Sequence, residues 1–220
     1  MARSRITVLL GVAGLVVVCV YLASALGVIR DVNNFTLSLV FAIGPVAIFG
    51  VVEISRRLTT QHELPTVKLG QVFLVIAFTL FTLMLVVQQT VSIRYRQLVT
   101  QAADSAHVET LRVAFGLVNQ VQLGIDVCFD IFYCVGVVLL SVAMFQHRDF
   151  GKFVGVFGVV SATALLVFNL ATFPGVPAES GLIDLGPLTG VWWILVIALM
   201  MRGAMRQRTG WTDKPSPRAL

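Results

Sequence analysis

The chain has 220 residues, of which 57% are hydrophobic and only 12% are charged, and its mean hydropathy is +0.91. Soluble domains carry about 25% charged residues, so this composition argues against a water-soluble enzyme and a disordered chain. The net charge of +5 does not indicate a nucleic-acid partner, because membrane proteins collect lysine and arginine in cytoplasmic loops. We therefore expect an integral membrane protein whose first partner is the lipid bilayer and that binds no nucleic acid.

Six apolar runs separated by charged residues are each long enough to cross a bilayer as a helix. About 20 apolar residues span the hydrocarbon core, and a helix satisfies its own backbone hydrogen bonds where no water is present. The fold class is predicted to be all-α, a polytopic six-transmembrane-helix bundle over residues 1–206. The predicted spans are Ile6–Ile29, Thr36–Ile54, Gly70–Ile93, about Val121–Phe145, Phe153–Phe173 and about Pro187–Met201.

The basic residues predict the orientation of the bundle. Twelve of the 16 lysines and arginines fall on one side of the six spans, and the exceptions are Arg30, Arg94, Arg96 and Arg112. Positive charge is retained on the cytoplasmic side, so both termini are expected in the cytoplasm. We expect a multi-pass protein of the cell membrane, of the bacterial inner-membrane kind, with a disordered cytoplasmic tail at 207–220.

The first span has an alternative interpretation. Arg3 and Arg5, the apolar stretch that follows them, and the small residues Ala23-Ser24-Ala25 also fit a cleaved signal peptide. The apolar stretch is long for a signal sequence, and cleavage would leave five spans. Whether residues 1–25 are ever removed stays open at this point.

Two features of the second and third spans predict local structure. Glu53 and Arg57 are four residues apart, a spacing that favours an ion pair on one helix face. Between about residues 94 and 115, charged and apolar residues alternate in a helical pattern that breaks at Asp104-Ser105. We expect spans three and four to continue there as a helical hairpin that projects from the outer surface.

A polar stripe follows the predicted fourth span. Its members are spaced by three or four residues, so they share one helix face: Asn119, Gln122, Asp126, Asp130 and Tyr133. Asp130 lies about 6 Å deeper than Asp126, and an ionised carboxylate facing lipid at depth costs about 3 kcal/mol. The stripe is therefore expected to face the interior of the bundle or water.

The stripe defines a candidate ligand-binding site. Together with polar residues expected at the same depth on neighbouring spans, the predicted binding residues are Asp126, Asp130, Asn119, Gln122, Tyr133, Asn169 and Gln88. In one hypothesis they line an outward-facing pocket for a cation, a proton or a small polar solute. In the other, Asp130 pairs with Asn169 or Gln88 and only holds helices together. Access of water to Asp130 distinguishes the two.

Small and aromatic residues mark the fifth and sixth spans. Gly151, Gly155 and Gly158 recur at helical spacing and favour close packing, either inside the protein or against another protomer or membrane partner. Trp192 and Trp193 are predicted to belong to the interfacial aromatic belt.

No motif for catalysis or cofactor binding is present. The three histidines are dispersed, and no phosphate-binding glycine loop or nucleophile motif occurs. An enzyme that uses the aspartates as acid and base is disfavoured because it would also need a nucleophile or metal ligands. We expect no cofactor, and whether a metal binds stays open.

Residues 121–173, which include QLGIDVCFDIFYCVGVVLLSVAMF and DFGKFVGVFGVV, and the later LIDLGPLTGVWW at 182–193 resemble uncharacterised six-span integral membrane families of bacteria. Such proteins join a polar fourth span to a glycine-rich fifth through a short basic turn. The resemblance covers about a third of the chain and implies a bacterial multi-pass protein without assigning any catalytic residue. The predicted function is small-solute or cation binding or transport; the alternative is a structural or partner subunit of a membrane complex.

Overall fold

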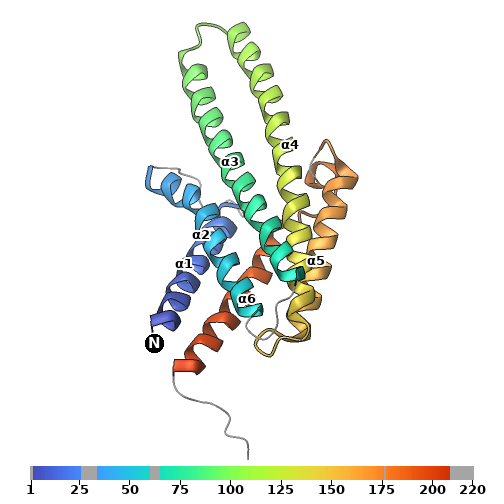
Figure 1. Cartoon of the computed structure of the whole chain (residues 1–220). Coiled ribbons are helices and arrows are strands. Elements are labelled where there is room, and N and C mark those ends of the chain that lie inside the picture. Colours follow the sequence, from blue (N-terminus) through green and yellow to red (C-terminus); the bar gives the residue numbers. More distant parts are fainter. Residues whose placement is uncertain (1, 26–33, 60–64, 176, 209–220) are drawn as a thin grey trace, which may run out of the picture.

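The computed structural model is all-α and describes residues 2–25, 34–59, 65–175 and 177–208 (Figure 1). These ranges contain six long helices and one short 3-10 helix, η1. The elements are α1 (Ala2–Ala25), α2 (Asn34–Leu58), α3 (Pro65–Gln101), α4 (Ser105–Met144), α5 (Gly151–Thr172), η1 (Pro177–Ser180) and α6 (Gly186–Arg208). The predicted tail at 207–220 falls almost wholly outside the described residues, as does Arg30 of the predicted first loop.

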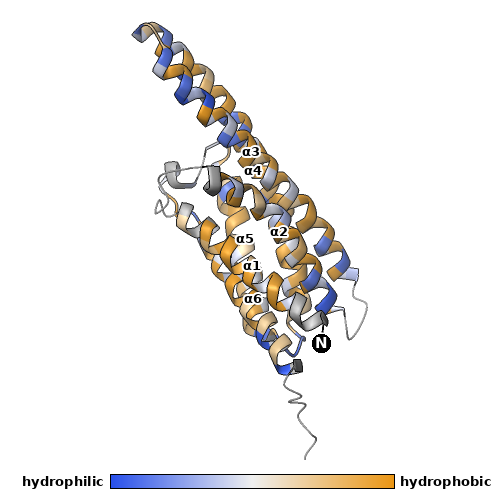
Figure 2. Ribbon diagram, turned by 90° about the vertical axis from the view of Figure 1, so that its left-hand side faces the viewer, coloured by the Kyte–Doolittle hydropathy of each residue, from blue (hydrophilic) through white to orange (hydrophobic). Residues whose placement is uncertain are grey.

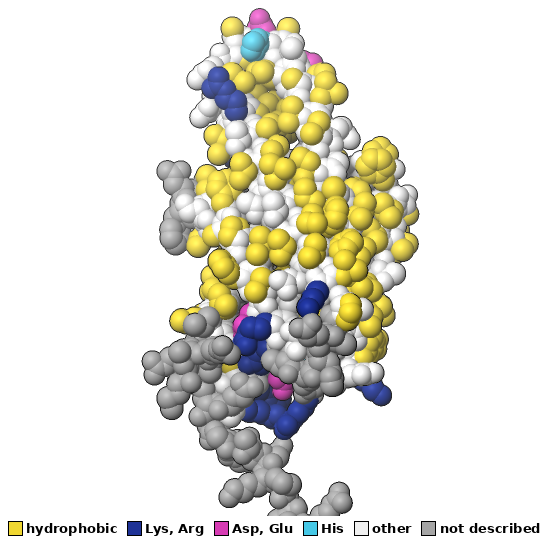
Figure 3. Space-filling model, viewed as in Figure 1, with side chains coloured by type: hydrophobic (Ala, Val, Ile, Leu, Met, Phe, Trp, Pro, Cys, Tyr) yellow, Lys and Arg dark blue, Asp and Glu magenta, His cyan; other side chains and the backbone are white. Residues whose placement is uncertain are grey.

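Within the described residues, five helices are long and apolar enough to cross a membrane: α2, α3, α4, α5 and α6. The apolar stretch found in α1, Thr7–Val20, is shorter. Large apolar side chains such as Leu9 and Phe153 are exposed on the outside of the bundle. Hydrophobic residues predominate along the middle of the helices in Figure 2, and hydrophobic side chains cover much of the middle of the face in Figure 3. The protein is therefore an integral, multi-pass membrane protein.

The helices form a closed ring. Each helix packs against the next one along the chain, and α6 packs against α1, whereas across the ring α2 touches α4 only lightly. The ring is filled toward the chain termini by a core of buried side chains, among them Leu74, Val137, Leu140, Met144 and Val196. A ring of six helices leaves central space wherever such side chains do not fill it.

Helices α3 and α4 extend beyond the other helices as a hairpin (Figure 1). α3 ends at Gln101 and α4 begins at Ser105, where the sequence pattern breaks. Asp104 caps α4 by accepting a hydrogen bond from the backbone amide of His107 at 2.7 Å, and the rings of Tyr95 and Phe115 stack between the two helices. We call this side of the molecule the hairpin end.

The opposite side, where α1 begins and α6 ends, is the terminal end (Figure 1). Glu53 accepts a hydrogen bond from Thr7 Oγ1 at 2.6 Å and two from Arg56, at 2.7 and 2.9 Å. Arg57 Nη1 lies 3.6 Å from Asp149 Oδ2. The expected Glu53–Arg57 ion pair is present at 3.9 Å, but Arg56 is the closer partner because Arg57 extends toward the α4–α5 turn. These five residues form the terminal-end cluster.

The glycines of α5 pack inside the protein. A Cβ atom at Gly155 would lie 2.8 Å from the carbonyl oxygen of Ser141 on α4, and one at Gly158 would lie 2.5 Å from Nε1 of Trp192 on α6. Trp192 Nε1 donates to the Val154 carbonyl at 2.9 Å across the same contact. Of the two packing modes considered for this strip, Gly155 and Gly158 serve the internal one. Gly151 has φ +76° and allows the turn into α5.

A candidate cation site in a central cavity

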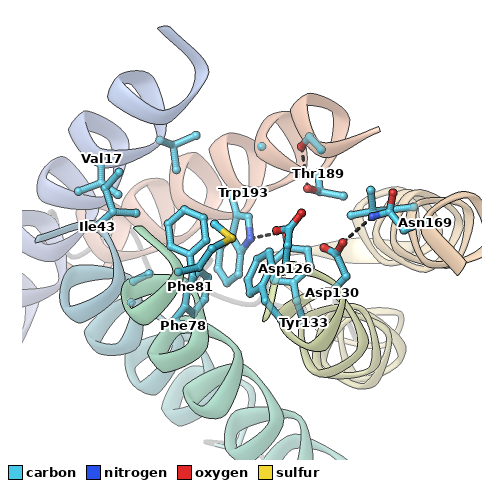
Figure 4. A pocket seen from close by; sticks show the side chains of 18 of the residues that line it. Val17, Ile43, Phe78, Phe81, Asp126, Asp130, Tyr133, Asn169, Thr189 and Trp193 are labelled. Carbon is cyan, nitrogen blue, oxygen red and sulfur yellow. Dashed lines mark hydrogen bonds between the residues drawn. The ribbon is translucent and has the colours of Figure 1, made fainter. Parts of the chain in front are cut away.

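A cavity of about 430 Å³ lies inside the ring and is lined by residues from all six helices. Its non-aromatic polar side chains come from α4, α5, α6 and the connection between the last two: Asp126, Asp130, Asn169, Asp184 and Thr189. Figure 4 shows all of these except Asp184 with labels. Asp184 is exposed on the protein surface. The cavity thus reaches the surface at the hairpin end, beside the α5–α6 connection.

Asp126 and Asp130 lie one turn apart on α4 and face the cavity, as the polar stripe predicts. Asp130 is only 5% exposed and accepts a hydrogen bond from the Asn169 amide on α5. Asp126 is half-buried and has no hydrogen bond or ion pair with any described residue, and no described lysine or arginine pairs with either aspartate. The polar side of the cavity therefore carries acidic groups without basic partners from the described part of the chain.

Aromatic rings form the wall beside these carboxylates. Phe129 and Tyr133 each lie three residues after an aspartate on α4, and their ring centroids are 5.2 Å apart. Phe78 of α3 contacts Tyr133 and Trp193 at centroid distances of 6.1 and 5.9 Å, and Phe81 contacts Phe129 at 5.2 Å. Aromatic faces attract cations, and so do carboxylates. Both parts of the wall therefore favour positively charged ligands.

Trp193 corrects one expectation from the sequence. It is buried inside the bundle and not in an interfacial belt, and its Nε1 donates a 2.8 Å hydrogen bond to the Tyr133 hydroxyl. Trp192 is fully buried as well. The sequence pattern could not identify Phe78, Phe81 and Trp193 as cavity residues, since apolar side chains on a membrane helix give no signal of which face points inward.

The structure brings together four of the seven predicted binding residues. Asp126, Asp130, Tyr133 and Asn169 line the cavity, whereas Asn119, Gln122 and Gln88 do not. The last three are half-buried. Asn119 lies about 10 Å beyond Asp126 along α4, where α3 and α4 have begun to leave the ring. A common helix face is therefore not enough to place all members of the stripe in one pocket.

The cavity changes character toward the terminal end. The lining residues of α1, of the second half of α2 and of the middle of α6 are all apolar: Leu10, Gly14, Val17, Val18, Val46, Ala47, Gly50, Ile54, Ile197 and Met200. From Thr189 to Met200 along α6 the rise is about 16 Å. The cavity is thus elongated, with carboxylates near one end and only apolar groups at the other.

We also searched the described residues for metal ligands and disulfide bonds. They contain no group of three or more histidine, cysteine, aspartate or glutamate side chains that could hold a metal ion. Cys19, Cys128 and Cys134 are free thiols.

No protein-family model matches the chain, and no curated protein or solved structure matches it either.

Proposed function

We propose that this protein binds a small cationic solute in the central cavity and carries it across the membrane. The observation that carries the proposal is that Asp126 and Asp130 face a cavity reaching the surface, without a basic partner among the described residues. An ionised carboxylate in a poorly solvated site is unfavourable unless a cation compensates it. A solute cation entering beside Asp184 supplies that charge.

The alternative function, a structural or partner subunit, has one observation in its favour. The hydrogen bond from Asn169 to Asp130 ties α4 to α5, which is the role that this hypothesis gives to Asp130. Asp126 separates the two functions, because a scaffold would not need a second carboxylate that faces a cavity and lacks such a bond. We therefore favour binding.

We also propose that α1 is a sixth span and that the terminal end is cytoplasmic. Arg56, Arg57, Lys68, Arg148 and Lys152 lie at that end, and the positive-inside rule places such residues in the cytoplasm. Cysteines introduced by Ser105→Cys at the hairpin tip and Gln146→Cys at the terminal end test this in whole cells. An impermeant maleimide should label only the first, above the background of the native cysteines. If only Gln146→Cys is labelled, the terminal end faces outward and the proposed orientation is wrong.

A binding experiment tests the cation site. The full chain in lipid nanodiscs is titrated with sodium, tetramethylammonium and decyltrimethylammonium chloride at constant ionic strength, and thermal unfolding is followed. At least one cation should raise the unfolding temperature of the wild type, and Asp126→Asn with Asp130→Asn should remove that rise. Asp104→Asn is the matched control, because it makes the same change at an exposed cap where asparagine also serves. Equal shifts in wild type and double variant would contradict the site.

Transport is tested separately in liposomes with the cation that gives the largest shift. Uptake by the wild type should exceed that of empty liposomes, and Asp130→Asn should lower it at least tenfold. If the cation binds but is not taken up, the protein binds cations and the proposal of transport is wrong. If Asp130→Asn takes up the cation as fast as the wild type, the solute does not pass through this cavity.

A further inference from the structure

The shape and lining of the cavity narrow the class of ligand, on the assumption that the proposed cation site is correct. We propose that the ligand is an elongated amphipathic organic cation, with an ammonium-type head beside Asp126 and Asp130 and an apolar body extending toward the terminal end. This inference is based on how the lining residues are distributed. Two carboxylates and an aromatic wall lie at one part of the cavity, and the rest of its length is apolar.

The head-group end suits an organic ammonium better than a bare inorganic ion. Inorganic cations are held by several oxygen ligands at close range, whereas much of the wall here is aromatic (Figure 4). The rings of Phe78, Phe81, Phe129, Tyr133 and Trp193 lie in mutual contact beside the carboxylates. Ring faces attract alkylammonium groups, which keep apolar methyl or methylene surface. The carboxylates supply charge and the rings supply the matching surface.

The rest of the cavity suits an apolar body. The volume of about 430 Å³ lies within the range of roughly 300 to 1,000 Å³ typical of organic-ligand sites and far exceeds the space a single ion needs. At the terminal end the lining side chains of α1, α2 and α6 offer no hydrogen-bonding group. Polar parts of a ligand would lose their hydrogen bonds to water there without replacement, so this end selects hydrocarbon.

Glycine 50 offers a way to shorten the apolar end without touching the carboxylates. Gly50 lines the cavity on α2, and a Cβ atom at this position would meet no other atom within 4 Å. Gly50→Leu should therefore place side-chain atoms in open cavity space. Gly116→Leu is the matched control, because Gly116 is equally open but lies on the hairpin away from the cavity.

The experiment measures the affinity of a homologous series. Radiolabelled n-alkyltrimethylammonium ions from ethyl to dodecyl are equilibrated by dialysis against the full chain in nanodiscs, with empty nanodiscs subtracted, and 1-alkanols of equal length serve as the neutral series. Each methylene buried in the cavity should raise the affinity about threefold to fourfold, up to the length that fills it. The neutral series should bind at least tenfold more weakly, and this wild-type comparison depends on no variant.

The variants should separate the contribution of the carboxylates to affinity from that of the apolar end of the cavity. Asp126→Asn with Asp130→Asn should weaken all lengths of the charged series alike. Gly50→Leu should leave ethyltrimethylammonium unchanged and weaken the decyl compound at least fivefold, whereas Gly116→Leu should change neither. Thermal unfolding of each variant verifies that it is folded.

The outcomes separate this inference from the proposed function. If binding depends on the aspartates but not on chain length, the amphipathic ligand is wrong and the cation site stands. If affinity rises with chain length equally for charged and neutral series and ignores the aspartates, both proposals fail. If Gly50→Leu weakens all lengths equally, the apolar end does not hold the ligand body, and the inference is overturned.

Discussion

The two ends of the bundle treat buried carboxylates in opposite ways. At the terminal end, Glu53 accepts three hydrogen bonds from Thr7 and Arg56, and a second arginine lies 3.9 Å away. In the cavity, Asp130 accepts one hydrogen bond from an amide, and Asp126 accepts none from the described residues. Glu53 is thus paired with arginines of the chain itself, whereas no described lysine or arginine pairs with Asp126 or Asp130.

The terminal-end cluster and the cavity also differ in how closely their atoms are packed. A Cβ atom at Gly203 would lie 2.7 Å from Arg57 Nη1 and 2.9 Å from Asp149 Oδ2, whereas one at Gly50 would meet nothing within 4 Å. The helices pack closely around the terminal-end cluster, whereas the apolar part of the cavity leaves open space beside Gly50.

The largest expected effect is at Arg57. Its side chain is 8% exposed and lies between Asp149 and Glu53. Removing one partner of a buried ion pair costs about 3 kcal/mol or more, so Arg57→Met should lower the free energy of unfolding by that amount in mixed-micelle equilibrium unfolding. Arg56→Met is the control, because its side chain is 46% exposed and its loss should cost about 1 kcal/mol or less. Equal losses would mean that burial does not set the strength of this cluster.

The most direct contrast between the ends replaces a carboxylate by its amide in each. Glu53→Gln should lower the free energy of unfolding by about 2 kcal/mol, because charge-assisted hydrogen bonds from Arg56 are weakened. Asp130→Asn should leave stability within about 0.5 kcal/mol of wild type or raise it, since Asn169 can still donate to the amide oxygen and an unpaired charge is removed. The same unfolding measurement checks both. A loss at Asp130 as large as that at Glu53 would assign Asp130 a structural role.

A smaller contrast tests the difference in packing. Gly203→Ala should destabilise the protein by about 1 to 2 kcal/mol, because the added methyl group separates Arg57 from Asp149. Gly50→Ala should be neutral or stabilising by about 0.5 kcal/mol, because alanine favours the helix and meets no neighbour. Thermal unfolding of the two variants side by side decides the point. A destabilising Gly50→Ala would show that the space beside it is not open.

The smallest expected effect gives the reference level for an exposed charge. Arg112 and Glu109 form a 3.9 Å ion pair on the hairpin with side chains 75% and 67% exposed. Glu109→Gln should therefore change the free energy of unfolding by less than about 0.5 kcal/mol. A change comparable to that of Glu53→Gln would indicate that the hairpin makes contacts beyond this ion pair.

Much of the architecture follows from patterns that local physics controls. Long apolar runs become helices because lipid offers the backbone no other hydrogen-bond partner, and the spacing of Asp126, Asp130 and Tyr133 places them on one face whatever the surroundings. The predicted depth of Asn169 on the fifth span also places it beside Asp130. These residues carry a strong signal because polar groups are rare in membrane helices.

The sequence by itself determined the solvent, the helical class, and the inward direction of Asp126 and Asp130, because each follows from the cost of exposing a polar group to hydrocarbon. Only the tertiary structure decided that the helices close into a ring around a cavity. It also decided that Trp193 faces inward, that the α5 glycines pack internally, and that Asn119, Gln122 and Gln88 lie outside the cavity. In a membrane both faces of a helix are apolar, so the sequence carries little information on which apolar face meets lipid and which meets another helix.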